Sequence, residues 1–271
     1  MIITPPYLKP GDTIAIVCPA GFMPFEKMQA CIATLESWGY NVKTGSTTQS
    51  TSQNYFSGTD EDRLADMQQM LDDDNIQAVL CGRGGYGLTR IIDNINFKKF
   101  KSKPKWVIGF SDVTVLLNHI YETCGVATLH APMAGAFNDA EPGNRFIASL
   151  QKVLEGRKIQ YAAEVHPFNR KGEAVGELVG GNLALFANCI GTDSDIKTRG
   201  KILFLEDVGE YLYNIDRMLR QLDRAGKLKK LAGLIVGGFT DMKDTERSFG
   251  QTVEEIIRDV VDGYDFPVCF G

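Results

Sequence analysis

The sequence predicts an α/β protein in which a parallel-sheet domain is followed by a second domain richer in β structure. From about residue 12 to residue 156, short apolar runs alternate with amphipathic stretches, which is typical of βαβ units around a parallel sheet. The pattern then changes, because residues 158–182 form short alternating runs with many glycines and charges, which favour β structure. We therefore expect a first domain over residues 1–157 and a β-rich α/β domain over residues 158–271.

Apolar runs and helical spacing predict the elements of the first domain. The expected strands are 13–18, 40–44, 76–81, 106–110 and 126–130, and the expected helices are 25–39, 59–74, 88–95, 113–125 and 142–156. Gly39 suits the position after a helix C-cap, and Thr59 or Asp60 is the expected N-cap of the second helix, whose first turn is acidic. Two of the strands, IQAVLC and WVIGF, are continuously apolar, as strands buried on both faces are.

The second domain is expected to continue with strands and helices in alternation. Apolar runs at 201–209 and 231–239 predict strands, and amphipathic stretches at 211–226 and 252–264 predict helices. Gly226 suits the end of the first of these helices. No internal repeat or low-complexity segment occurs in the sequence.

Charge and hydropathy exclude several classes of partner. Lysines and arginines number 29 against 34 aspartates and glutamates, which gives a net charge of -5 and no basic stripe that could follow a phosphate backbone. Nucleic acid is therefore not an expected partner. The N-terminus lacks the pattern of a secretion signal, and no apolar run approaches the ~20 residues of a membrane span. We expect a protein of the cytoplasm that has no membrane partner.

The cysteines fit the same compartment. Most lie within apolar segments, and their spacing includes no Cys-x-x-Cys pair or other metal-binding pattern. The six are Cys18, Cys31, Cys81, Cys124, Cys189 and Cys269. We expect reduced core residues, as in cytoplasmic proteins, and no metal site.

A serine stands where the strand WVIGF meets the next predicted helix. In an open parallel sheet, ligands gather at the carboxyl ends of strands, so Ser111 could be a nucleophile on a strand-to-helix turn. The N–H groups and dipole of the helix would then stabilise an oxyanion. The alternative is that Ser111 or Asp112 only caps the helix, since G-x-S-D is not the G-x-S-x-G elbow.

A glycine-rich loop, CGRGGYG at residues 81–87, follows the preceding strand. It satisfies G-x-G-x-x-G formally, but it is not on the first strand, and the basic stretch 102–106 stands where an acid should bind a ribose. Such a loop still lets a ligand approach bare backbone N–H groups. Because sequential strands tend to be neighbours, we expect this loop and Ser111 on one rim, although an ordinary turn remains open.

Two acids, Glu206 and Asp207, end the apolar strand KILFL. At least one carboxylate is expected to be hydrogen-bonded, and it could orient a histidine in a nucleophilic triad or stand near the start of the following helix. Of the three histidines, His119 is about 12 Å along the helix from Ser111 and so out of reach. His166 is expected in a linker. His130, at a strand end, is the one candidate base on the expected rim, or a structural residue.

Six motifs in a fixed order resemble the LD-carboxypeptidase family, the serine peptidases of the muramoyl-tetrapeptide carboxypeptidase type. They cover essentially the whole chain and read LKPGDTIAIVCPAG, RGGYG, GFSD, HAPM, GGNL and FLEDVGEYLYNIDRML. The resemblance implies a Rossmann-like N-terminal domain that carries the nucleophile and a β-rich C-terminal domain that carries the rest of a Ser-Glu-His triad. It also implies release of terminal D-alanine from cytoplasmic murein tetrapeptide in cell-wall recycling, without metal or organic cofactor, by a homodimer.

Residue by residue, the resemblance makes Ser111 the nucleophile and Glu206 the acid. The oxyanion donors would be the backbone N–H of Asp112 and of Gly84 or Gly85, and Arg83 is a candidate ligand for the terminal carboxylate of the substrate. The family histidine follows a segment like FPVCFG, with which this sequence ends. We therefore expect that the C-terminus is truncated or incompletely reported. A triad that ended at Gly271 would have no base, and we do not assign that role to His130.

Three other functions remain open at this point. A microcin-type immunity peptidase that cleaves aminoacyl nucleotides should need an aromatic platform, and neither Trp38 nor Trp106 is placed to provide one. A non-catalytic two-domain protein could bind an anion with the glycine loop. A nicotinamide-dependent enzyme would need the loop to bind a dinucleotide.

Overall fold

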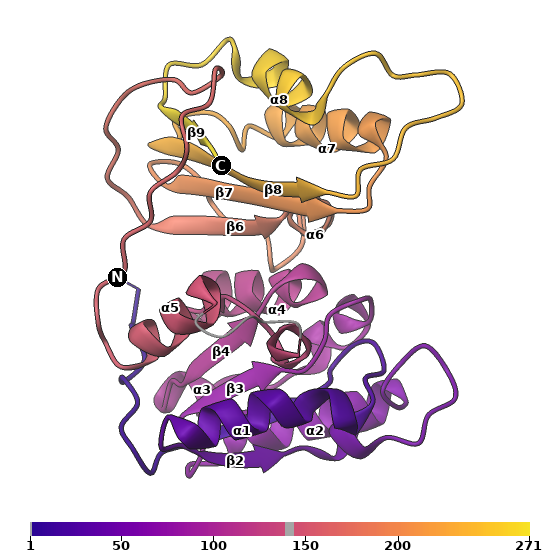
Figure 1. Cartoon of the computed structure of the whole chain (residues 1–271), viewed down its shortest axis with the longest axis vertical. Coiled ribbons are helices and arrows are strands. Elements are labelled where there is room, and N and C mark those ends of the chain that lie inside the picture. The colour runs from indigo at the N-terminus through magenta and orange to yellow at the C-terminus, as the bar shows by residue number, and fades with distance from the viewer. Residues whose placement is uncertain (1, 139–143) are drawn as a thin grey trace. The chain divides into compact units, whose positions relative to one another are not determined.

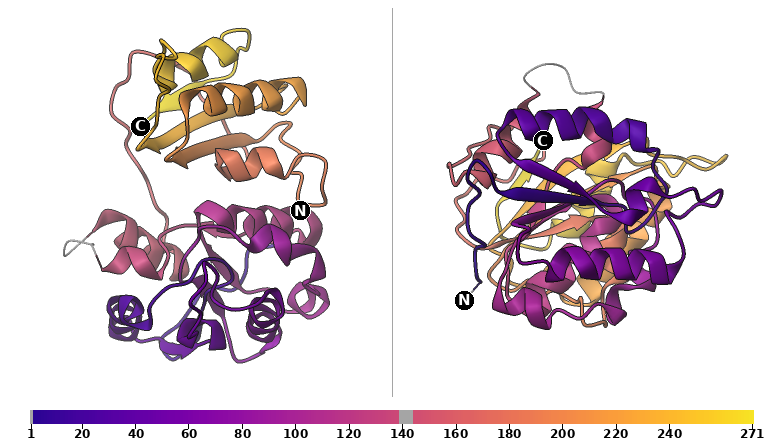
Figure 2. Two further views of the ribbon diagram at one scale, coloured as in Figure 1. Left: turned by 90° about the vertical axis from the view of Figure 1, so that its right-hand side faces the viewer. Right: turned by 90° about the horizontal axis from the view of Figure 1, so that it is seen from below.

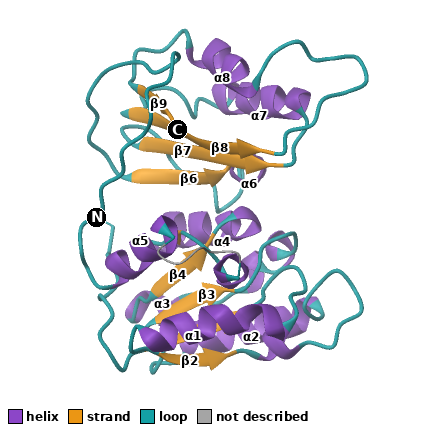
Figure 3. Cartoon of the chain, in the orientation of Figure 1, coloured by secondary structure: helices purple, strands orange, loops and turns teal. Residues whose placement is uncertain are grey.

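The computed structural model describes residues 2–138 and 144–271, and the chain divides into two units, Met1–Gln160 and Tyr161–Gly271. Each unit is built on its own parallel β-sheet with helices packed against it (Figures 1 and 3). The predicted α/β class is therefore confirmed for both halves of the chain.

The sheet of the first unit has five strands in the order β2-β1-β3-β4-β5, all parallel. The strands are β1 (Thr13–Val17), β2 (Asn41–Thr44), β3 (Ala78–Cys81), β4 (Trp106–Gly109) and β5 (Leu129–His130). The chain first moves to one edge of the sheet and then returns past β1 to the other. All carboxyl ends therefore lie along one rim, where the turns after β3 and β4 are neighbours.

Both faces of this sheet are covered, because right-handed crossovers in opposite directions place α1 and α2 on opposite sides (Figure 2). The helices are α1 (Gln29–Ser37), α2 (Asp60–Asp72), α3 (Lys98–Ser102), α4 (Thr114–His119) and α5 (Arg145–Leu154). Gly39 has φ +90° just beyond the C-cap of α1, as expected. Thr59 is the N-cap of α2 and forms a reciprocal capping box with Asp62. The first two residues of the helix predicted at 142–156 lie outside the described residues.

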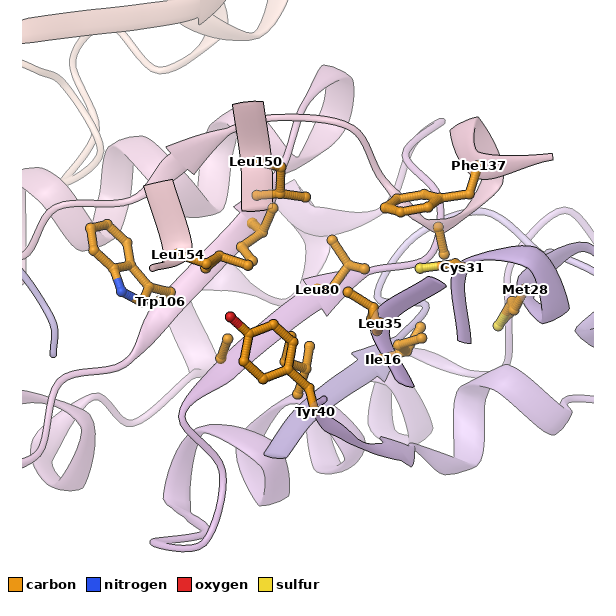
Figure 4. Packing of buried hydrophobic residues seen from close by; sticks show 14 of the residues in the cluster. Ile16, Met28, Cys31, Leu35, Tyr40, Leu80, Trp106, Phe137, Leu150 and Leu154 are labelled. Carbon is orange, nitrogen blue, oxygen red and sulfur yellow. The ribbon is translucent and has the colours of Figure 1, made fainter. Parts of the chain in front are cut away.

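The core on one face of the sheet joins α1, α5 and the turn Ala134–Phe137 to the central strands (Figure 4). Ile16 and Leu80 are almost entirely buried in it, and Leu35 and Leu154 pack from the helices. Full burial of such side chains stabilises a fold by about 1.5–3 kcal/mol each. This packing fixes the strands whose ends carry the candidate site.

The helix predicted at 88–95 is wrong. The structure has two short 3-10 turns there, Leu88–Arg90 and Ile92–Asn94. Three isoleucines resist a helix through their stiff β-branched side chains, and the Asp93-Asn94 pair favours turns. The glycine loop is therefore not followed by the α-helix that a dinucleotide site would require.

The second unit has a four-stranded parallel sheet in the order β6-β7-β8-β9. Its strands are β6 (Leu178–Asn182), β7 (Ile202–Val208), β8 (Gly233–Thr240) and β9 (Val268–Phe270), and its helices are α6 (Leu183–Asn188), α7 (Leu212–Arg224) and α8 (Val253–Val261). Because the strands follow chain order, right-handed crossovers place all three helices on one face. As predicted, α7 ends just before Gly226, which has φ +75°.

The prediction of mainly β structure over 158–182 is wrong for most of that range. A strand forms only at Leu178–Asn182, and the rest is irregular apart from an isolated bridge between Arg170 and Val268. Val165 and Val175 are almost fully exposed. The apolar residues that suggested strands therefore have no sheet face to pack on.

Two further expectations concern cysteines and membranes. The six cysteines all lie within the described residues and none is in a disulfide; four of them are buried, as predicted for core residues. Within the described ranges 2–138 and 144–271, no helix is both long and apolar enough to cross a membrane.

Candidate active site

Ser111 lies at the carboxyl end of β4 with a left-handed backbone, φ +59°. This conformation costs a non-glycine residue about 1–2 kcal/mol, and such strain gathers at functional sites. The chain can turn this sharply because Gly109 lacks a side chain: a Cβ there would lie 2.7 Å from Cγ1 of Val113. Ser111 then begins a 3-10 turn, Ser111–Val113, that leads into α4. The half-buried serine is thus held on a strained strand-to-helix turn.

The alternative that Ser111 or Asp112 only caps the helix is wrong. No side-chain cap hydrogen bond forms at the start of the 3-10 turn or of α4, both of which lie within the described residues. The carboxylate of Asp112 points elsewhere: it is fully buried, and its Oδ2 accepts a 2.9 Å hydrogen bond from the backbone N–H of Leu88. Asp112 therefore joins the serine turn to the end of the glycine loop.

The glycine loop lies directly against Ser111. A Cβ built on Gly84 would be 3.0 Å from Cβ and 3.1 Å from Oγ of Ser111, and 3.4 Å from the backbone N of Asp112. The carbonyl of Gly84 accepts a 3.0 Å hydrogen bond from the N–H of Gly21, which fixes the turn from the other side. The predicted shared rim of these two turns is confirmed. Only a glycine at position 84 lets the loop backbone approach the serine hydroxyl this closely.

Desolvation raises the pKa of Asp112 to about 6, against the opposing effects of the Leu88 hydrogen bond and the positive charge of Arg63. Asp112 comes directly after Ser111 in the chain. Its buried carboxylate, bonded to Leu88, therefore holds in place a residue whose backbone N–H could stabilise an oxyanion.

Arg63 is a residue of this site that the sequence analysis missed. It is fully buried in α2, where its Nη1 donates to the carbonyls of Pro19 at 2.6 Å and Gly87 at 3.1 Å. Its guanidinium also pairs with Asp60 and lies 4.8 Å from the centre of the Phe56 ring. The helical pattern around it gave no sign of this role, because an arginine in an amphipathic helix normally faces water. Arg63 thus joins the loop after β1 to the end of the glycine loop, which in turn lies against Ser111.

Arg83 leaves the same loop with its side chain exposed. Its Nη1 donates a 2.8 Å hydrogen bond to the carbonyl of Phe22, so one end of the guanidinium is tethered. The remaining N–H groups of such a fork suit a carboxylate ligand. Arg83, Gly84, Gly85, Ser111 and Asp112 are thus brought together in the first unit.

Glu206 lies in β7 of the second unit. Side chains alternate along the strand, so Leu205 and Asp207 are buried whereas Glu206 is half-buried and points to the face opposite the helices. Desolvation raises the pKa of Glu206 to about 7, the nearby charge of Asp207 adds to this, and a hydrogen bond from Asn182 opposes it. A carboxyl group that titrates near neutrality is typical of catalytic acids and bases.

Asp207 has a structural role near the start of a helix, as the alternative interpretation of the two acids expected. The helix is α6, however, and not the following helix α7. The Oδ2 of Asp207 accepts a 3.0 Å hydrogen bond from the N–H of Ala184 in the first turn of α6, rather than bonding α7. Its Oδ1 accepts from Asn182 Nδ2 at 2.9 Å and from the N–H of Val208 at 2.8 Å. The prediction that at least one of the two carboxylates is hydrogen-bonded is therefore confirmed.

The histidines have separate environments. His130 lies beside Phe110 with ring centres 6.0 Å apart, and desolvation lowers the pKa of His130 to about 4. His119 is buried against Phe97. His166, in the irregular segment before β6, stacks on Phe270 with ring centres 4.8 Å apart. A weakly basic His130 is a poor proton acceptor for a serine at neutral pH.

Comparisons with known proteins show which family the chain belongs to. The LD-carboxypeptidase N-terminal domain profile matches residues 14–131 and the C-terminal domain profile matches residues 175–271. A probable murein peptide carboxypeptidase of Bacillus subtilis (strain 168) is 37% identical over 98% of this chain and 84% of its own length.

Solved structures share the whole fold. The crystal structure of muramoyltetrapeptide carboxypeptidase from Oxalobacter formigenes is 28% identical, with a TM-score of 0.82, over 96% of this chain and 87% of that one. Microcin C7 self immunity protein MccF, in complex with aspartyl sulfamoyl adenosine, is 22% identical with a TM-score of 0.85, over 100% and 89% of the two chains, a likeness of fold alone. With both domain profiles matched in order and a relative similar along nearly its whole length, the protein belongs to the LD-carboxypeptidase family.

Proposed function

We propose that the protein is a serine L,D-carboxypeptidase that releases terminal D-alanine from murein tetrapeptide. The conformation of Ser111 carries the proposal: a half-buried hydroxyl on a left-handed turn, beside a glycine loop and a following helix. Relatives named for murein peptides and muramoyl tetrapeptides support the substrate class. The bond cleaved would join an L-centre to the terminal D-residue.

In the first step, Ser111 Oγ attacks the carbonyl carbon of the scissile amide and its proton passes to a base. The backbone N–H of Asp112 and of Gly84 or Gly85 stabilise the oxyanion, a contribution of about 3–4 kcal/mol per donor in such sites. The amine of D-alanine leaves with that proton, and water then hydrolyses the acyl-enzyme to restore the serine. Arg83 holds the terminal carboxylate.

By the family resemblance, Glu206 is the acid of a Ser-Glu-His triad and orients the histidine that serves as the base. When the imidazole accepts the serine proton, its positive charge favours the ionised form of the neighbouring carboxyl and so lowers the pKa of Glu206 from about 7. His130 is not given this role, because desolvation has lowered its pKa.

The rival immunity-peptidase function lacks an aromatic platform at either tryptophan. Trp106 is buried, and its Nε1 donates a 3.0 Å hydrogen bond to the carbonyl of Pro6. Trp38 packs against the core beside Phe137, with ring centres 6.4 Å apart. The Trp106 ring is therefore not available to stack on a nucleobase, and the Trp38 ring is partly covered by the core.

The decisive experiment is incubation of the full-length protein, as its gene encodes it, with murein tetrapeptide. Mass spectrometry should detect tripeptide and free D-alanine in equal amounts. Intact substrate, together with a Ser111 that a fluorophosphonate fails to label, would favour the non-catalytic ligand-binding alternative. A role in cytoplasmic recycling and a homodimeric state are further parts of the proposal, to be tested by cell fractionation and by sedimentation.

A further inference from the structure

The hydroxyl of Tyr55 lies against Gly85 of the glycine loop. The preceding residue, Gly84, lies against Ser111. A Cβ built on Gly85 would be 2.7 Å from the hydroxyl oxygen of Tyr55, just as one built on Gly84 would be 3.1 Å from Oγ of Ser111. The two hydroxyls therefore stand against consecutive glycines, whose Cα atoms are about 3.8 Å apart. Tyr55 and Gly85 are both exposed, so the phenol is accessible to a ligand.

The Tyr55 hydroxyl differs from that of the neighbouring exposed tyrosine. The phenol of Tyr86 interacts with the guanidinium of Arg90, which in turn pairs with Asp60. Among residues 2–138 and 144–271, no hydrogen-bond partner is found for the hydroxyl of Tyr55. One phenol is thus occupied by the protein, whereas the other has a donor to offer a ligand.

The backbone of Phe22 holds Tyr55 and Arg83 in place together. Its N–H donates a 2.8 Å hydrogen bond to the carbonyl of Tyr55, and its carbonyl accepts the 2.8 Å bond from Arg83 Nη1. The Tyr55 ring is further supported edge-on by Phe56, with ring centres 5.3 Å apart. A phenol and a guanidinium are therefore fixed beside the same short loop before any ligand arrives, which reduces the entropy lost on binding.

We propose that Tyr55, acting with Arg83, binds the free terminal carboxylate of the substrate and so restricts cleavage to the last residue of a peptide. The inference rests on the proposed function for its reaction. In a C-terminal residue, the carboxylate lies one residue beyond the carbonyl that Ser111 attacks. That step matches the one from Gly84 to Gly85 along the loop. A guanidinium and a phenol supply charged and neutral donors to the two carboxylate oxygens, which accept several hydrogen bonds.

The test compares Tyr55→Phe with the matched control Tyr86→Phe on two substrates, murein tetrapeptide and the same peptide with a C-terminal carboxamide. Tyr55→Phe should lower kcat/KM for the acid roughly tenfold or more, mainly through KM, because a hydrogen bond to a charged group is lost. Its activity on the carboxamide should be unchanged. Tyr86→Phe should leave the ratio of acid to carboxamide activity as in the wild type. Equal losses on both substrates in Tyr55→Phe would overturn the inference.

A binding measurement separates this inference from the reaction itself. Calorimetry with Ser111→Ala protein should show tighter binding of the acid than of the carboxamide, and adding Tyr55→Phe should remove most of that preference. This result would support the carboxylate site even if the wild type released no D-alanine, an outcome that would end only the proposed function. An unchanged preference in the double variant would overturn the role of Tyr55.

Discussion

Gly84 is in direct contact with Ser111, and the space between them leaves no room for a methyl group. A Cβ on Gly84 would lie 3.0 Å from Cβ of Ser111, closer than side-chain carbons normally approach. The serine cannot yield easily, because its backbone is already held in a strained conformation between β4 and the following turn. The position of the hydroxyl is therefore set by the absence of a side chain on another loop.

This contact predicts that Gly84→Ala lowers kcat about tenfold or more, since displacements below 1 Å disturb a positioned nucleophile. The protein should remain folded, because the substitution adds one methyl group and requires no left-handed backbone at position 84. Steady-state kinetics on murein tetrapeptide provide the measurement. Gly263→Ala is the control, since a Cβ there meets nothing within 4 Å. Wild-type turnover in Gly84→Ala would contradict the predicted role of the contact.

The backbone of Ser111 makes a separate prediction about stability. Ser111→Gly should be more stable than Ser111→Ala by about 1 kcal/mol, because glycine adopts φ +59° without the steric cost that alanine keeps. Both variants should be inactive and unlabelled by a fluorophosphonate. Thermal unfolding of the two proteins gives the comparison. If the alanine variant unfolded at the same temperature or higher, the turn would not be strained.

The sequence predicted the sheet of the first unit well because its signals are local. Continuous apolar runs gave β3 and β4, and Thr59 and Gly39 marked helix ends through side-chain and backbone chemistry within a few residues. The segment 158–177 was wrongly expected to be β because alternation alone does not supply a partner strand. Pairing depends on residues far along the chain, which no local pattern shows.

The same distinction applies to the site. The serine and the glycine loop could be placed on one rim, because parallel strands that follow one another tend to be neighbours. The role of Arg63 could not be predicted from the sequence, because its burial depends on the carbonyls of Pro19 and Gly87, which approach it only in the folded unit. Tyr55 was equally hidden, because only the folded loop brings its hydroxyl to Gly85.

The two neighbouring acids of β7 should respond differently to neutralisation, because they point to opposite faces. Asp207→Asn should destabilise the protein by about 2 kcal/mol, since an amide nitrogen would replace one of two oxygens that now accept hydrogen bonds from Asn182, Ala184 and Val208. Denaturant unfolding at neutral pH measures the loss. The exposed Asp193→Asn variant is the control and should be neutral. Similar stability for both variants would show that Asp207 does not hold α6.

Glu206→Gln should instead become relatively more stable as the pH rises. Desolvation raises the pKa of Glu206 to about 7 in the folded protein from an ordinary 4.5. Between these values the unfolded chain has released a proton that the folded chain retains, so the stability of the wild type falls as pH increases. Glutamine carries no such proton. The difference in unfolding free energy between variant and wild type should therefore grow by about 2 kcal/mol from pH 4 to pH 8, after allowance for partial exposure, and then level off.

The control for this pH dependence is Glu246→Gln, which removes the same charge from an exposed position. Its stability relative to the wild type should vary little over the same range. Glu206→Gln should also lower kcat by a factor on the order of 10⁴, the scale seen when the acid of a serine triad becomes an amide. A variant that gains stability with pH yet keeps full turnover would show that the carboxyl is merely buried, because the energetic cost of ionising Glu206 would then have no counterpart in catalysis.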